Sequence, residues 1–222
     1  MKILPFRLLI SAAAWLTLGG CAATSSITQQ TQKSKADARI ALAEAYLQQG
    51  EPSKAWKNLT LARQYSPDSL ATQMALAHYY QQVGEMDSAE HQYQQAIERH
   101  SQSGELLNNY GAFICKQGRY LESLIWFAKA RQQPGYAHIA RNFENAGYCA
   151  LKAQHLSEAS DYFAKSVAHD PNRAQTWLTL IDLHIQLEQF IKAQQYLNRY
   201  KQRFGQDTHT HKRQGIITMM SQ

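Results

Sequence analysis

The chain lacks the features that mark an enzyme or a membrane-spanning protein. Its 222 residues have a mean hydropathy of −0.50, which excludes an integral membrane protein with several long apolar spans. The motifs HExxH and GxSxG and the phosphate-binding loop are absent from the sequence. We therefore expect no catalysis, no cofactor and no small-molecule substrate.

Charged residues and helix-breaking residues are also scarce. Only 18% of the residues are charged, and five prolines and eleven glycines interrupt the chain, which favours helix. The formal net charge of +6 comes from Lys and Arg side chains that are spread along the sequence and mixed with Asp and Glu. A protein that binds nucleic acid usually concentrates its cations on one face. We expect solvated helix surfaces and no nucleic-acid partner.

The histidines do not form a metal-binding pattern. Of nine histidines, only His209 and His211 lie close together in sequence. This pair lies in a terminal segment, and scattered surface histidines are the better interpretation of the set, so we predict no metal site.

The N-terminus has the pattern of a bacterial lipoprotein signal peptide. Lys2 and Arg7 precede and flank an apolar stretch that is too short to span a bilayer stably, and Leu18-Gly19-Gly20-Cys21 follows it. This tetrapeptide resembles a lipobox, which predicts a signal peptide over 1–20 and an acylated Cys21. The alternative is an ordinary secretory leader with a chance cysteine.

The residues after Cys21 bear on the destination and the attachment of the protein. Ala22 stands where an Asp commonly retains similar lipoproteins at the inner membrane, so the analogy implies an outer-membrane location with the body facing the periplasm. The segment 22–35 is rich in Ser, Thr and Gln and lacks apolar periodicity. We therefore expect residues 21–35 to be the acylated cysteine and a flexible tether.

Small and aromatic residues recur every 34 positions in the rest of the chain. This period is typical of tetratricopeptide (TPR) repeats, in which each unit is a pair of antiparallel helices. It predicts an all-α, right-handed superhelical solenoid of five repeats, with 208–222 as a partial sixth repeat or capping helix. The predicted repeats are 36–69, 70–103, 104–137, 140–173 and 174–207.

One position of the repeat requires a left-handed backbone. Gly50, Gly84 and Gly118 stand where the first helix of a repeat ends, and glycine adopts that conformation without steric cost. Gln154 and Glu188 replace this glycine in the fourth and fifth repeats. We expect those two turns to be strained or differently shaped.

The first helices of TPR repeats line the inner groove of the family this chain resembles, so groove residues can be assigned by register. Asn109 and Asn145 stand where TPR proteins often place an asparagine that binds a peptide. The alternative for both is a hydrogen bond to their own helix neighbours. The predicted groove residues are His78, Asn108, Asn109, Tyr110, Lys116, Arg141, Asn145 and Tyr148.

Two cysteines remain after Cys21, and they are 34 residues apart. Cys115 and Cys149 fall on the first helices of neighbouring repeats, where the two α-carbons could come within bridging distance. An oxidising periplasm favours a disulfide between them, and two buried thiols are the alternative. A periplasmic redox protein would be a third possibility for function, but the CxxC pair is missing.

Two segments of the third and fourth repeats resemble one family more specifically than they resemble TPR proteins in general. LLNNYGAFICKQGRYLESLIWF at 106–127 and ARNFENAGYCALKAQHLSEASDYF at 140–163 resemble the PilW/PilF type IV pilus biogenesis lipoproteins. The resemblance implies a pilotin, which binds the pilus secretin subunit and promotes its outer-membrane localisation and multimer assembly. The alternative is another lipid-anchored TPR adaptor, serving barrel-protein insertion or cell-wall enzymes.

Overall fold

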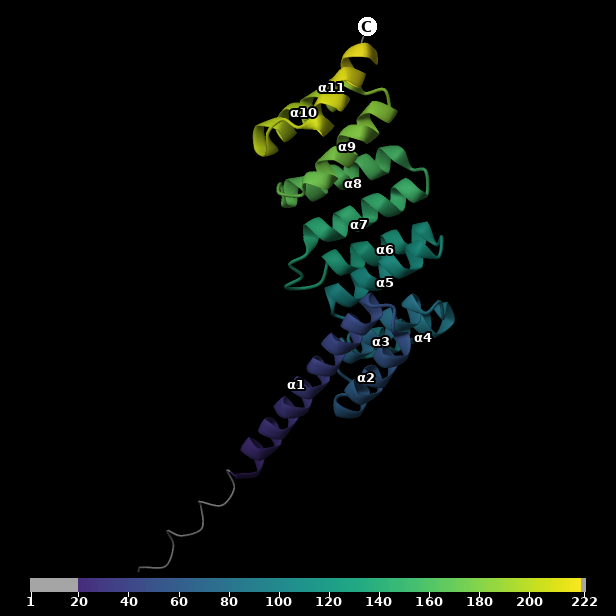
Figure 1. Ribbon diagram of the computed structural model, residues 1–222, viewed down its shortest axis with the longest axis vertical. Coiled ribbons are helices and arrows are strands. Elements are labelled where there is room, and N and C mark those ends of the chain that lie inside the picture. The colour runs from purple at the N-terminus through teal and green to yellow at the C-terminus, as the bar shows by residue number, and fades with distance from the viewer. Residues whose placement is uncertain (1–19, 221–222) are drawn as a thin grey trace, which may run out of the picture. The chain divides into compact units, whose positions relative to one another are not determined.

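Residues 20–220 are described in this computed structural model, and over this range the chain forms eleven helices and no strand (Figure 1). The all-α fold predicted from the sequence is confirmed. The helices are α1 (Gly20–Gln48), α2 (Pro52–Tyr65), α3 (Leu70–Gln82), α4 (Met86–Arg99), α5 (Gly104–Lys116), α6 (Tyr120–Arg131), α7 (Ile139–Lys152), α8 (Leu156–His169), α9 (Ala174–Gln186), α10 (Phe190–Phe204) and α11 (Thr208–Met220). None of them is long and apolar enough to cross a membrane within the described range.

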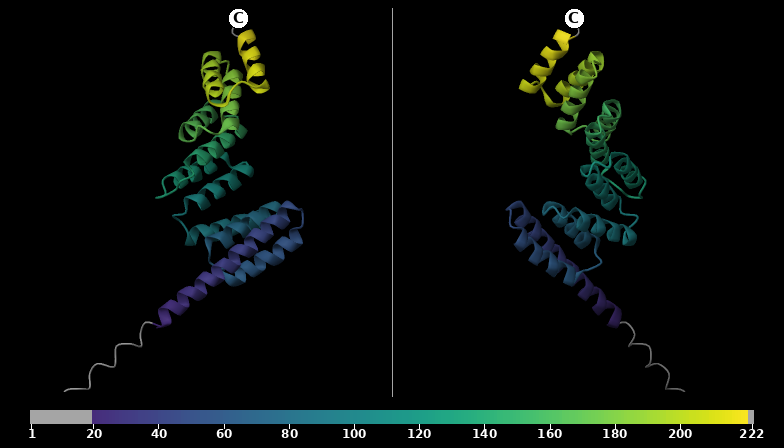
Figure 2. Two further views of the ribbon diagram at one scale, coloured as in Figure 1. Left: turned by 60° about the vertical axis from the view of Figure 1, so that its left-hand side comes forward. Right: turned by 90° about the vertical axis from the view of Figure 1, so that its right-hand side faces the viewer.

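The helices follow the 34-residue period. We call the first helix of each repeat the A helix (the last part of α1, then α3, α5, α7, α9 and α11) and the second the B helix (α2, α4, α6, α8 and α10). The chain divides into two compact units, one ending at Gln92 and one beginning at Tyr93. In the second unit, α5 to α11 pack one after another in chain order, as all three views show (Figures 1 and 2). The fold is a TPR solenoid.

Helix pairs pack closely because a very small residue of the A helix faces an aromatic ring of its B helix. A Cβ atom added to Gly111 would lie 3.0 Å from the ring of Phe127, and one added to Gly147 would lie 2.8 Å from the ring of Phe163. Both phenylalanines are fully buried. The rings therefore fill the space that the missing side chains leave.

Each unit has its own apolar core. In the first unit, α1 contributes Ala36, Ile40 and Ala43, and α2 and α3 cover them. In the second unit the largest cluster lies among α7 to α11, with Leu180 and Leu197 fully buried. The covering residues of the first unit are Ala55, Leu59, Ala62, Ala75 and Leu76.

Several A helices begin at a side-chain cap. Ser69 accepts a hydrogen bond from the backbone N–H of Thr72, and Ser103 accepts one from Leu106. The carboxylate of Asp207 accepts one from the N–H of Thr210 at 2.8 Å. These caps satisfy backbone donors that the helix leaves unpaired, and so they fix where the A helices start.

The flexible tether predicted for residues 21–35 is wrong, because this segment belongs to α1. No glycine or proline occurs between Cys21 and Gln49, so nothing in the sequence breaks a helix there. The part of α1 that contains Ala36 and Ala43 is packed against α2 and is therefore already helical. Extending an existing helix fixes one residue per added hydrogen bond, which is far easier than starting one. The predicted signal peptide, apart from Gly20, lies outside the described residues.

The turns after the A helices share one backbone conformation whether or not glycine is present. Gly50, Gly84 and Gly118 have φ of 73°, 83° and 80°. Gln154 and Glu188 have φ of 63° and 56° at the equivalent positions. Both side chains are exposed, so they make few packing contacts that could offset the strain of the left-handed backbone. The last two turns therefore keep the shape of the others at a steric cost.

Replacing Gln154 by Gly should raise the free energy of unfolding by about 1 kcal/mol, because a non-glycine residue pays roughly this cost in the left-handed region. Urea unfolding followed by circular dichroism would measure the change. The matched control is Gly118→Ala, which should lower stability by a similar amount. An added Cβ at Gly118 meets nothing within 4 Å, so the loss would come from the left-handed backbone and not from a clash with a neighbour. An unchanged or less stable Gln154→Gly variant would show that this turn is not strained.

Candidate functional site

The A helices have one side that neither their own B helix nor the next repeat covers. We call this side the A-face of each unit. Along it lie exposed polar and charged residues together with partly exposed apolar ones. The exposed residues are Glu44, Gln48, His78 and Gln82 in the first unit, and Lys116, Tyr148, Lys152, Asp182 and Gln186 in the second.

In the first unit the A-face is hollowed between α1 and α3. A hollow of about 350 Å³ is lined by Glu44, Leu47 and Gln48 of α1 and by His78 and Gln82 of α3. The amide of Gln82 donates to the Nε2 atom of His78 at 3.0 Å. His78, predicted as a groove residue, thus lies in a small depression with amide, imidazole and apolar groups. Such a mixture suits a peptide segment that is held by burial and by hydrogen bonds to its backbone.

In the second unit four asparagines form a hydrogen-bonded cluster between α5 and α7. Asn142 and Asn145 donate to the Oδ1 atom of Asn108, at 3.0 and 3.3 Å. The amide nitrogen of Asn108 lies 3.4 Å from Oδ1 of Asn109, and Arg131 donates to Asn142. The cluster ties two neighbouring A helices together. Asn109 therefore has a hydrogen bond to its own helix neighbour, whereas Asn145 bonds to a residue of the adjacent A helix.

Two of the predicted groove residues are core residues. The side chain of Tyr110 is only 3% exposed, because it packs against the rings of Tyr93, Phe113 and Trp126. Asn108 is 1% exposed inside the amide cluster. Neither side chain is accessible to a partner in this structure, so both assignments to the groove surface are corrected.

The other predicted groove residues remain at least partly accessible. Tyr148 is 37% exposed, and its ring packs edge-on against Phe163 with 4.9 Å between the centroids. Lys116 is exposed at the end of α5, and Arg141 is partly buried in the first turn of α7. His78 is exposed, and Asn109 and Asn145 are partly buried, so these residues also remain at least partly accessible to a partner.

Two acidic side chains of the second unit's A helices, Glu144 and Asp182, are paired inside the chain. Glu144 on α7 accepts hydrogen bonds from Arg173 and from Thr176 on α9. The hydrogen bond and charge of Glu144 raise the pKa of the Arg173 guanidinium above its ordinary value. Asp182 on α9 accepts two hydrogen bonds from the guanidinium of Arg213 on α11, at 2.7 and 2.5 Å. These pairs link consecutive A helices and neutralise the carboxylates.

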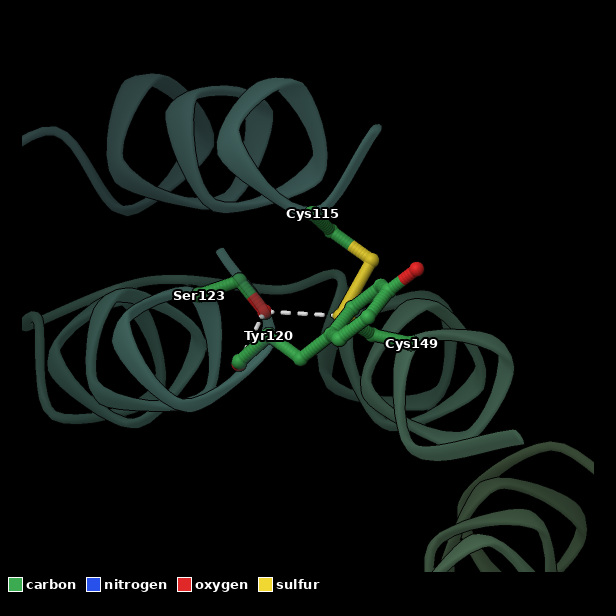
Figure 3. Close-up of a disulfide and its surroundings, with 4 residues drawn as sticks. All are labelled: Cys115, Tyr120, Ser123 and Cys149. Carbon is green, nitrogen blue, oxygen red and sulfur yellow. Dashed lines mark hydrogen bonds between the residues drawn. A yellow bond between two sulfur atoms is a disulfide. The ribbon is translucent and has the colours of Figure 1, made fainter. Parts of the chain in front are cut away.

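A disulfide joins Cys115 of α5 to Cys149 of α7 (Figure 3). The two α-carbons are 5.9 Å apart, within the range for a bridge. The Oγ atom of Ser123 lies 2.8 Å from Sγ of Cys149 and donates to the carbonyl of Tyr120 (Figure 3). Both cysteines are buried. The structure thus contains the bridge rather than two thiols, and its burial disfavours thiol exchange with another protein.

Sequence reasoning missed the polar residues that link the A helices. Asn142, Thr176 and Arg173 were not identified, although Asn142 and Thr176 stand at the third position of their repeats, 140–173 and 174–207. Thr72 and Thr210 occupy the same register position, and all four side chains at this position are fully buried. A polar residue that recurs at a buried register position is the signal that could have found them. Within the described residues, no group of three His, Cys, Asp or Glu side chains could hold a metal ion.

Comparison with known proteins gives sequence relatives over most of the chain. The sequence matches the tetratricopeptide repeat family over residues 74–137 and again over residues 150–212. A Haemophilus influenzae protein described as uncharacterized is 36% identical over 156 residues, which cover 70% of this chain and 86% of that protein. The type IV pilus assembly protein PilF of Pseudomonas aeruginosa is 33% identical over 171 residues, covering 77% of this chain and 68% of PilF.

Solved structures of related proteins also align with most of the chain. The structure of Pseudomonas aeruginosa PilF aligns with a TM-score of 0.69 and 28% identity, covering 86% of this chain and 90% of that one. PilW, described as a widely conserved type IV pilus biogenesis factor, aligns with a TM-score of 0.68 over 84% of this chain and 89% of its own. Its identity of 24% supports the shared fold alone.

Removing the disulfide should destabilise the second unit. The double variant Cys115→Ala, Cys149→Ala should lose about 3 kcal/mol of unfolding free energy, as expected for a bridge that closes a loop of this length. Urea unfolding with and without a reductant would measure the loss. Reductant should lower the stability of the unaltered protein towards that of the variant and leave the variant unchanged. An unaltered protein that is insensitive to the reductant would contradict the bridge.

Proposed function

Because the chain belongs to the PilF/PilW family of type IV pilus TPR proteins, we propose that it is an outer-membrane lipoprotein that acts as a pilotin. In this role it binds the pilus secretin subunit and promotes its outer-membrane localisation and multimer assembly. The observation that carries the proposal is the 33% identity to PilF over 77% of the chain, which includes both cysteine-containing segments quoted above. A TPR protein of pilus biogenesis implies protein partners and suggests a non-catalytic adaptor.

The proposed location is supported by two features of the chain. The lipobox-like tetrapeptide ends at Cys21, and two or three acyl chains on that cysteine would anchor the protein without spanning the bilayer. The disulfide between Cys115 and Cys149 fits an oxidising compartment such as the periplasm. Cys21 is the second residue of α1, the helix that also contributes to the hollow of the first unit.

In the proposed mechanism the A-faces bind the partner, and the lipid anchor determines where the protein is located. The hollow lined by Glu44 and His78 and the exposed A-face around Tyr148 would bind segments of the secretin subunit. Both surfaces are built on helices, so they exist before the partner arrives and little ordering entropy is lost on binding. The anchor would concentrate captured subunits at the membrane where they assemble.

Cells that lack the protein should contain fewer secretin multimers in the outer membrane. Membrane fractionation followed by detection of detergent-resistant secretin multimers would measure this, with the gene restored in trans as the control. Monomeric secretin should accumulate instead, since its synthesis is unaffected. Unchanged multimers in the outer-membrane fraction would disprove the pilotin proposal.

Replacing Cys21 by Ser should release the protein from the outer membrane without changing its fold. The acyl chains supply the attachment, whereas the described cores begin at Ala36. Fractionation would locate the variant, and its circular dichroism spectrum should match that of the unaltered body. The control is Ser25→Ala, in the same segment, which should stay in the outer membrane. Retention of the Cys21→Ser variant there would refute the anchoring part of the proposal.

A further inference from the structure

The A-face of the second unit has an unbalanced set of charges. Its carboxylates Glu144 and Asp182 are each held by an arginine of the chain. Lys116 and Lys152 are exposed, and no acidic side chain among the described residues forms an ion pair with either. Glu105 lies on the same helix as Lys116 but about 16 Å away along its axis. The accessible charge at the C-terminal ends of α5 and α7 is therefore positive.

The disulfide lies directly beside these two lysines. Lys116 follows Cys115, and Lys152 comes one helical turn after Cys149. The bridge holds α5 and α7 with the two α-carbons of the cysteines 5.9 Å apart (Figure 3), and Lys116 and Lys152 belong to the last turns of these two helices. An acidic group near these two helix ends would be attracted by both ammonium groups.

An apolar row continues the same surface towards α11. Leu151 and Ile185 occupy the register position of Cys115 on α7 and α9, and both are partly buried against the core of the second unit. Met219 occupies that position on α11 and is 67% exposed, and its neighbour Met220 is 53% exposed. Flexible methionine side chains adapt to differently shaped apolar partners. The surface thus changes from cationic over α5 and α7 to apolar over α9 and α11.

We propose that the A-face of the second unit binds an amphipathic protein segment whose acidic end lies over Lys116 and Lys152 and whose apolar end lies over Ile185 and Met219. Neighbouring packed helices are about 10 Å apart. Two carboxylates seven residues apart in a helical segment, or three apart in an extended one, are separated by about the same distance. The occupant is a segment of a partner protein whose carboxylates complement Lys116 and Lys152, because neither lysine forms an ion pair within the described residues.

The proposal rests on the proposed function only in assuming a protein partner, so it is tested by direct binding. The probes are two labelled synthetic peptides of about 14 residues, the length of α7. They share an apolar half of Leu and Phe, and their other half has either Glu or Lys at the same positions. Fluorescence anisotropy with the detergent-solubilised full-length protein measures both dissociation constants.

The Glu peptide should bind at least about tenfold more tightly than the Lys peptide, and added salt should reduce the difference. The double variant Lys116→Glu, Lys152→Glu should reverse the preference. The matched control is Lys192→Glu, an exposed lysine on the B helix α10 of the same unit, which should keep it. Met219→Ser should weaken the binding of both peptides, while the preference for the Glu peptide remains. Melting curves of every variant would show that the fold is retained.

The proposal would be overturned if the protein bound the two peptides with equal affinity or bound neither. It would also be overturned if the Lys116→Glu, Lys152→Glu double variant still preferred the Glu peptide. Self-association in sedimentation experiments that is lost in the double variant would also overturn it, since the occupant would then be a second copy of the chain. The outcome is independent of the pilotin role. Secretin multimers that depend on the protein while the peptide preference is absent would leave the proposed function standing and remove this inference alone.

Discussion

The fold of the third and fourth repeats depends on the contact between a glycine of the A helix and a phenylalanine ring of its B helix. Gly111 and Gly147 leave no room for a Cβ atom beneath the rings of Phe127 and Phe163. A larger side chain there would push the ring or the helix away, at a cost typical of overpacked cores. The contact therefore sets the distance between the paired helices, and its recurrence in the third and fourth repeats gives these two repeats the same geometry.

Because the B helices cover one side of the A helices, the opposite side is available for polar chemistry. The asparagine cluster joins α5 to α7, Glu144 joins α7 to α9, and Asp182 joins α9 to α11. Pairs of this kind add little stability when exposed, but they fix the relative position of neighbouring helices. The two ion pairs also neutralise Glu144 and Asp182. The exposed lysines then determine its charge, so the contacts that order the array also give it a preference for acidic partners.

The sequence was sufficient for features that depend on register alone. The period predicted the helix pairs, and the glycine position predicted the left-handed turns, which even Gln154 and Glu188 adopt. It was insufficient where a side chain's environment depends on its neighbours. Register placed Tyr110 near the groove, but Trp126 and Tyr93 cover it. The segment 21–35 has the composition of a tether, yet it extends a helix that packing at Ala36 has already stabilised.

That helical extension changes what the proposed anchor can do. A flexible segment of about 14 residues has a typical end-to-end distance of roughly 20 Å in any direction. In α1, by contrast, Cys21 and Glu44 belong to one helix, and the rise per residue puts them about 35 Å apart along a single axis. If Cys21 is acylated as proposed, the helix fixes the separation between the lipid attachment and the hollow beside Glu44. A coil of the same residues would let this separation vary.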